Sequence, residues 1–239
     1  MESQAQSTEV NSLSAGARRF TVGVFMLMFA GLAITSACVY TFNTYDYCQN
    51  LLVDQQGHIS LLFWLSLFGP FLVSLVIRKG INAISVFGLY LLFLIYAALT
   101  GICFSYILAI LGVTDSSLFA VFITACLAFG IMGIVGFTTR IDPNQAKPIV
   151  YFLGGGLVAV IPIVFLFPGP DMSLGVSFIG VMVFMGMGIL HFSDLRDTAD
   201  QPGFDDATGK RMAVLYSLYL YADFVNLFFF LVAMLFKRK

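Results

Sequence analysis

The chain has 239 residues, of which 59% are hydrophobic and 10% are charged, and its mean hydropathy is +0.94. A soluble domain has about 25% charged residues, so this composition excludes a water-soluble fold. The formal net charge of −1 leaves no basic surplus for binding nucleic acid. Because a transmembrane helix needs about 20 apolar residues, we expect an all-α polytopic protein whose main partner is the lipid bilayer.

The basic residues divide the apolar sequence into pairs of membrane spans. No Lys or Arg occurs in residues 20–77, 80–139 or 148–193, and each of these intervals is long enough for two spans and a short loop. A last apolar stretch follows alone. The seven predicted spans are residues 20–42, 59–77, 84–111, 117–137, 148–168, 172–192 and 212–236.

The same pattern predicts the domain boundaries and the orientation. Residues 1–19 are predicted to be a polar, disordered tail, residues 20–236 a single seven-helix membrane domain, and residues 237–239 a basic C-terminal tail. Basic residues flank one side of the span pairs, so the positive-inside rule places the N-terminus in the cytoplasm. Seven full spans put the C-terminal tail outside, whereas a re-entrant last helix would return it, and the sequence leaves both arrangements open.

An acid inside a predicted span is the main functional signal. Asp223 lies near the middle of residues 212–236, where an ionisable side chain costs roughly 2.5–3.5 kcal/mol on insertion scales. Asp194 is expected at the cytoplasmic end of the sixth span, and His191 lies three residues earlier on the same helical face. If the two carboxylates meet they share a proton, which makes them a pH sensor and, when ionised, transient ligands for calcium.

Structural roles are the alternatives for the same side chains. Asp194 would then be an interfacial acid, and His191 a hydrogen-bonding residue at the interface. Asp223 would be a protonated carboxyl bonded to Tyr219 or Asn226. An intramembrane aspartyl protease typically carries Gly-x-Gly-Asp, whereas this chain reads Leu-Tyr-Ala-Asp at 220–223. We therefore expect no enzymatic activity and no cofactor, with calcium at most the transported ion.

Three segments of the chain resemble a known family of membrane proteins. Residues 220–228 read LYADFVNLF, close to LYLDFINLF in the last helix of that family. Residues 95–101 read IYAALTG, and residues 122–142 contain FITA, then FG, then GFTTRID. In consistent order over about residues 20–232, the chain resembles the Bax inhibitor-1 (transmembrane Bax-inhibitor-motif) family, in particular a prokaryotic member.

The resemblance implies a fold and a mechanism. The fold is seven helices, with the last helix surrounded by the other six. Family members are linked to pH-dependent calcium leak, and their sensor, an aspartate pair on helices six and seven, carries over onto Asp194 and Asp223. The family usually has Tyr-Asp at the first position, whereas this chain has Ser193 before Asp194, which leaves Asp197 as an alternative partner. A basic residue at the end of the second helix pairs with the acids in the family, and Arg78, or else Lys79, matches it.

Two function hypotheses follow. The first is a monomeric pH-sensitive calcium or cation leak channel of a bacterial inner membrane, or of an endomembrane such as the ER in a eukaryote. The second is a regulatory membrane protein that binds a membrane protease or a stress or cell-death factor. Its docking elements would be the N-terminal tail and the loop between Phe192 and Arg211.

Overall fold

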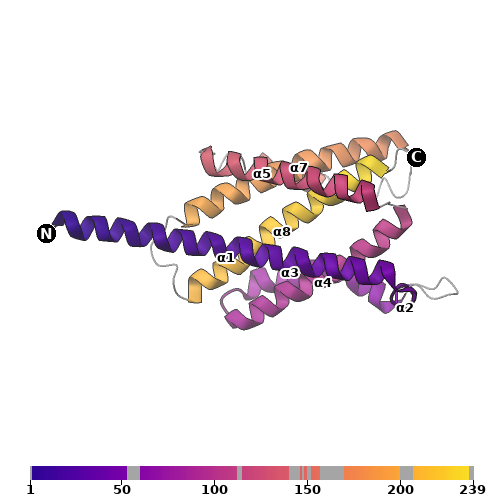
Figure 1. Ribbon diagram of the computed structural model, residues 1–239, viewed down its shortest axis with the longest axis horizontal. Coiled ribbons are helices and arrows are strands. Elements are labelled where there is room, and N and C mark those ends of the chain that lie inside the picture. Colours follow the sequence, from indigo (N-terminus) through magenta and orange to yellow (C-terminus); the bar gives the residue numbers. More distant parts are fainter. Residues whose placement is uncertain are drawn as a thin grey trace. The chain divides into compact units, whose positions relative to one another are not determined.

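The computed structural model describes residues 2–52, 60–111, 115–139, 146, 148–149, 152–156, 170–199 and 207–236. The elements with described bounds are all α-helices (Figure 1). They are α1 (Glu2–Thr44), α2 (Asp46–Asn50), α3 (Leu61–Gly80), α4 (Val86–Leu111), α5 (Asp115–Thr138), α7 (Pro170–Ala199) and α8 (Ala207–Phe236).

Six of these helices are long and apolar enough to cross a membrane, which confirms a multi-pass, all-α membrane protein. The candidate spans are Gly16–Thr44, Leu61–Gly80, Val86–Ala109, Leu118–Thr138, Leu174–Ala199 and Ala207–Leu235. They correspond to six of the seven predicted spans. Most of the predicted fifth span, residues 148–168, lies outside the described residues. The seven-span arrangement and a last helix surrounded by six others therefore stay predictions.

Local chemistry explains where α3 begins and ends. The hydroxyl of Ser60 accepts a hydrogen bond from the N–H of Phe63 at 3.3 Å, which satisfies one of the free donors of the first turn. Arg78 and Lys79 lie in the last turn, where positive charge is favourable beside the free carbonyl groups. The apolar sequence between these ends has the length that the hydrocarbon core requires.

The helix α1 begins earlier than the sequence predicts. A disordered tail is predicted for residues 1–19, whereas the backbone is helical from Glu2. Residues 2–15 contain neither Gly nor Pro. Because the apolar part of α1 nucleates the helix, each further residue adds a hydrogen bond without a new nucleation cost, and the helix extends through a polar sequence.

The loop predicted between Phe192 and Arg211 is wrong in its bounds. The helix α7 continues to Ala199, and α8 begins at Ala207. Asp194 and Asp197 therefore lie within a helix rather than at its end or in a loop. The helical backbone places them at a defined angle relative to His191.

The chain divides into two compact units, and α8 contributes to both. Unit 1 contains Met1–Gly112 and Thr198–Leu218, and unit 2 contains Val113–Asp197 and Tyr219–Lys239. The first part of α8 belongs to unit 1, and the part from Tyr219 onward belongs to unit 2.

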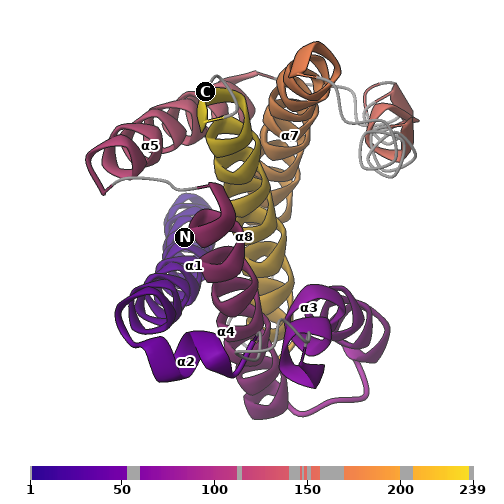
Figure 2. The same ribbon diagram turned by 90° about the vertical axis from the view of Figure 1, so that its right-hand side faces the viewer.

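In unit 1, α4 packs against both α1 and α3 (Figure 2). Gly101 lets α1 and α4 approach closely, because a Cβ at this position would lie 2.7 Å from the carbonyl oxygen of Thr35. The Thr35 hydroxyl donates a hydrogen bond to the carbonyl of Ala97 at 3.0 Å. Ser217, on the first part of α8, donates to the carbonyl of Val24 on α1 at 2.9 Å. Small residues and hydroxyl groups thus join the helices of this unit.

In unit 2, aromatic rings and a glycine join α5, α7 and the second part of α8. The ring centroids of Phe192 on α7 and Phe129 on α5 are 5.0 Å apart, and Phe129 also lies 5.4 Å from Phe224 on α8. A Cβ on Gly136 would lie 2.7 Å from the carbonyl oxygen of Ile189, so α5 and α7 are nearly in backbone contact there. These contacts bring the faces of α7 and α8 that carry the polar side chains together.

Candidate functional site: a buried histidine–aspartate pair

The acid that the sequence places inside a span is buried and paired with a histidine. Oδ2 of Asp223 on α8 lies 2.6 Å from Nδ1 of His191 on α7. Asp223 is 1% exposed and His191 is 8% exposed. Both residues lie within candidate membrane spans, so the pair is a polar contact between two apolar helices. Such a contact is rare within membrane spans and marks a candidate functional site.

Neighbouring side chains hold both members of the pair. The imidazole of His191 stacks on the ring of Tyr219, with centroids 4.8 Å apart and an interplanar angle of 14°. Gly188, one turn before His191, has no side chain, and a Cβ there would lie 3.9 Å from Cβ of Asp223 and 2.9 Å from the sulfur of Met132. The absence of a side chain at Gly188 lets the acid lie against α7.

The geometry defines what the pair can do chemically. At 2.6 Å, the two groups form a short hydrogen bond whose donor depends on the tautomer of the imidazole. A lone carboxylate in this environment would be costly to bury, whereas a carboxylate bonded to a histidine is compensated. Carboxylate oxygen is also a ligand that calcium prefers. The pair can therefore hold a proton and, after losing it, attract a cation.

Asp194 and Asp197, the two predicted partners of Asp223, lie further along α7. Asp194 is half-buried, one helical turn after His191. Asp197 has a half-exposed side chain that forms a salt bridge with Nη2 of Arg196 at 2.7 Å. The structure places His191 in contact with Asp223, and the pairing of Asp194 with Asp223 stays a prediction.

Three further residues are predicted to belong to the site: Asn226, Arg78 and Lys79. The side-chain amide of Asn226 donates to the carbonyl of Ala222 on its own helix at 2.8 Å. Arg78 and Lys79 lie in unit 1, in the last turn of α3, and both side chains are exposed. Pairing of either basic residue with the acids stays a prediction.

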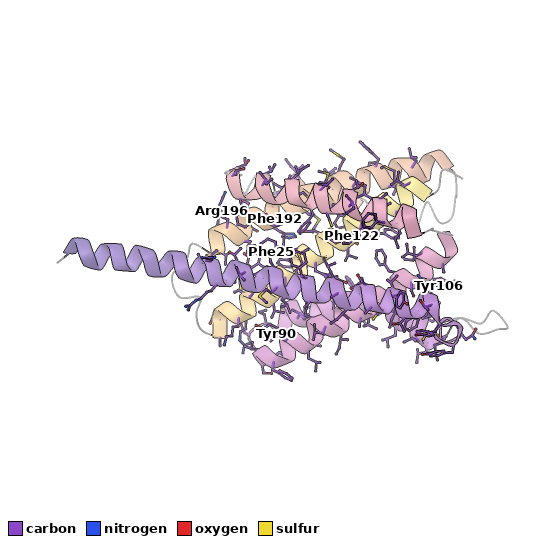
Figure 3. All side chains as sticks on the ribbon, in the orientation of Figure 1. Phe25, Tyr90, Tyr106, Phe122, Phe192 and Arg196 are labelled. Atoms are coloured by element: carbon purple, nitrogen blue, oxygen red, sulfur yellow. The ribbon has the colours of Figure 1, made fainter. Side chains whose placement is uncertain are left out.

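Arg196 is a residue that the sequence analysis did not select. Its Nη1 donates to the carbonyl oxygens of Phe137 and Thr139, both at 3.2 Å, at the end of α5. The guanidinium therefore satisfies carbonyl groups that α5 cannot bond internally. Figure 3 shows Arg196 and Phe192 on α7, where Phe192 packs against α5. A basic residue near a helix end was the available signal, but its partner helix could not be inferred from sequence.

Comparison with known proteins shows the family. Residues 17–239 match the model of the family described as inhibitor of apoptosis-promoting Bax1. The chain belongs to this Bax1 inhibitor family. It is 25% identical to the inner membrane protein YbhL of Escherichia coli over 241 residues, which covers all of both chains. It is 30% identical to a protein of Deinococcus radiodurans over 220 residues, covering 90% of this chain and 88% of the relative. A membrane protein of Streptococcus pyogenes is also 30% identical, over 217 residues, 89% of this chain and 90% of its own.

Proposed function

We propose that this Bax1 inhibitor family member is a non-enzymatic, pH-sensitive cation leak protein, with calcium as the cation that the resemblance implies. We further propose a bacterial inner membrane as its location, as the name of YbhL states for that relative, with the N-terminus in the cytoplasm. The observation that carries the proposal is Asp223, an acid that is 1% exposed inside a candidate span and bonded to an ionisable histidine.

A shared proton keeps the site closed in this proposal. While the pair carries the proton that makes it neutral overall, as imidazolium with carboxylate or as imidazole with carboxyl, the hydrogen bond holds α7 to α8. Loss of the proton leaves a buried negative charge, which is unfavourable in hydrocarbon surroundings unless a cation compensates it. An entering cation would supply that charge, and α8 would loosen from α7. The leak is therefore expected to rise with pH.

The groups around the pair decide how it titrates. On α7, His191 is followed one turn later by Asp194, and on α8 itself Tyr219 stacks on the imidazole. The described part of α5 faces the site with Met132 and Phe129, neither of which ionises. Within the described residues of unit 2, a carboxyl, an imidazole and a phenol group are therefore the ionisable side chains around the pair.

The test is calcium flux into liposomes that contain the purified protein and a calcium-sensitive dye. The flux is measured at several pH values for the wild type, Asp223→Asn, His191→Asn and Asp194→Asn. The amide in Asp223→Asn cannot lose a proton in the titrated range, so the flux should lose its dependence on pH. His191→Asn should shift the pH dependence, because it removes the group bonded to the acid.

Asp197→Asn is the matched control, because this acid lies on the same helix but is exposed and bonded to Arg196. Its flux should follow the wild-type pH profile. An unchanged pH profile in Asp223→Asn would overturn the proposed gate. No flux above empty liposomes at any pH would overturn the leak itself.

A regulatory role is the competing candidate, because the family description names a partner protein, Bax1. The loop between Phe192 and Arg211, predicted to dock the partner in this hypothesis, is shorter than the sequence indicates, since residues 193–199 and 207–210 are helical. Deletion of residues 2–15 separates the two hypotheses. Loss of a membrane protease from co-purification, with an unchanged flux, would favour regulation over conduction.

A further inference from the structure

A shallow groove lies on unit 1, where α3 ends and the chain turns into α4. The groove has a volume of about 360 Å³. Its lining residues are Leu75, Val76, Lys79, Gly80 and Ile84. Lys79 is the only residue of this set with a charge. Because the candidate span Leu61–Gly80 ends here, the groove lies where a membrane protein meets the lipid headgroups.

The turn beside the groove is held by backbone and side-chain contacts. The N–H groups of Ala83 and Ile84 donate to the carbonyl of Gly80 at 3.0 and 2.8 Å. A Cβ on Gly80 would lie 2.5 Å from Cδ1 of Ile84, so the isoleucine side chain occupies the space that glycine leaves. The groove wall is therefore part of a defined turn rather than of a free chain end.

Positive charge gathers at this end of unit 1. Arg211, near the start of α8, donates hydrogen bonds to the carbonyl oxygens of Ile81 and Ile84, so α8 begins beside the turn between α3 and α4 (Figure 1). These carbonyls are neutral, so the bonds hold the guanidinium without cancelling its charge. Lys210 precedes it with an exposed side chain, and Lys79 is exposed as well. Neither α3, residues 81–85 nor the unit 1 part of α8 contains an acid.

We propose that this groove binds an anionic phospholipid. One acyl chain lies along Leu75, Val76 and Ile84, and the headgroup phosphate lies at the basic end formed by Lys79, Lys210 and Arg211. An apolar channel that ends in positive charge matches a molecule with an acyl chain and a phosphate. A free phosphate ion would gain nothing from the apolar wall, so the lipid is the occupant that fits both features.

The experiment measures lipid binding to the purified full-length protein in a neutral detergent by native mass spectrometry. Phosphatidylglycerol is titrated beside phosphatidylcholine, and inorganic phosphate is added as a competitor. The wild type should retain one phosphatidylglycerol in preference to phosphatidylcholine, and phosphate should not displace it. Ion flux is not measured, so this result stands or falls separately from the proposed leak.

Two pairs of variants test the two halves of the site. Val76→Trp fills the groove, and Leu72→Trp is its control on the same helix outside the groove; these positions are 49% and 57% exposed, so neither tryptophan enters the core. Lys79→Gln removes the charge at the groove, and Arg19→Gln removes an exposed charge of unit 1 that does not line it. Val76→Trp and Lys79→Gln should each weaken phosphatidylglycerol binding about fivefold, with the two controls close to wild type.

Other outcomes overturn the proposal. Equal losses in Lys79→Gln and Arg19→Gln would show diffuse attraction to basic residues at the membrane surface. A loss in Lys79→Gln without a loss in Val76→Trp would show a headgroup contact without a groove. Displacement by inorganic phosphate would identify an anion site rather than a lipid site.

Discussion

The two units of this protein join their helices with different polar chemistry. In unit 1, hydroxyl groups of Thr35 and Ser217 donate to backbone carbonyls of neighbouring helices at 3.0 and 2.9 Å. In unit 2, an ionisable side chain contacts another ionisable side chain, His191 with Asp223, at 2.6 Å. The first kind of contact is between groups that do not ionise, and the second is between two ionisable groups.

A response to pH or to cations requires a group that can change its charge. Hydroxyl-to-carbonyl bonds between membrane helices stabilise by roughly 0.6 kcal/mol on average and carry no charge. A buried ionisable pair is costly to separate, because one partner would be left charged or unpaired in a medium of low dielectric constant. Ser217 and Asp223 lie on the same helix, so α8 carries one contact between groups that do not ionise and one between ionisable groups.

The largest predicted effect comes from breaking the ionisable pair. Asp223→Ala leaves His191 buried without its partner, and loss of one partner of a buried pair costs about 3–5 kcal/mol. Unfolding of the purified protein in micelles, titrated with denaturant, should show this loss. Its dependence on pH should also differ from that of the wild type.

Asp223→Asn is the control for side-chain volume. The amide keeps an oxygen that can accept a hydrogen bond from the imidazole, so the loss should be smaller than in Asp223→Ala. Equal losses in both variants would mean that volume rather than the bond to His191 stabilises this part of unit 2. The stability of unit 2 would then not depend on the ionisable contact between His191 and Asp223.

Helix positions could be predicted from the sequence, but the contact between His191 and Asp223 could not. Hydropathy and charge placed six spans close to the helices that the structure contains. The sequence also selected Asp223 and His191 but paired Asp223 with Asp194. His191 and Asp194 lie three residues apart on one face of α7, a rise of about 4.5 Å. The axial position of α7 relative to α8 decides which side chains of α7 approach Asp223, and the periodicity of the sequence does not contain that position.

The close helix crossings at Gly136 and Gly101 are expected to show a loss of unfolding free energy of intermediate size. Gly136→Ala in unit 2 places a methyl group 2.5 Å from Cβ of Phe192 and 2.7 Å from a backbone oxygen of α7, and Gly101→Ala in unit 1 meets α1 equally closely. Because backbone must move in both cases, each variant should lose about 1–3 kcal/mol of unfolding free energy. Gly130→Ala and Gly23→Ala are the matched controls, since a Cβ at either position meets nothing within 4 Å.

The two glycine variants change helix packing without changing any charge, so they separate the two contributions to the stability of each unit. Overpacking should destabilise both units alike, and the loss should be the same at pH 6 and pH 8. A loss that depends on pH in Gly136→Ala but not in Gly101→Ala would show that the crossing of α5 and α7 is coupled to the nearby His191–Asp223 pair.

The smallest predicted effect is at the hydroxyl contact of unit 1. Ser217→Ala removes a hydroxyl that donates to the carbonyl of Val24 at 2.9 Å and to that of Ala213 on its own helix at 2.6 Å. The expected loss of unfolding free energy is roughly 0.6 kcal/mol. The remaining carbonyl still accepts its own intrahelical hydrogen bond, so no charged or unsatisfied donor is left behind. The loss should therefore be independent of pH, in contrast to that of Asp223→Ala six residues later on the same helix. If Ser217→Ala instead shifted the pH dependence of unfolding, the two parts of α8 would respond as one element, and the proton at Asp223 would act through the whole helix.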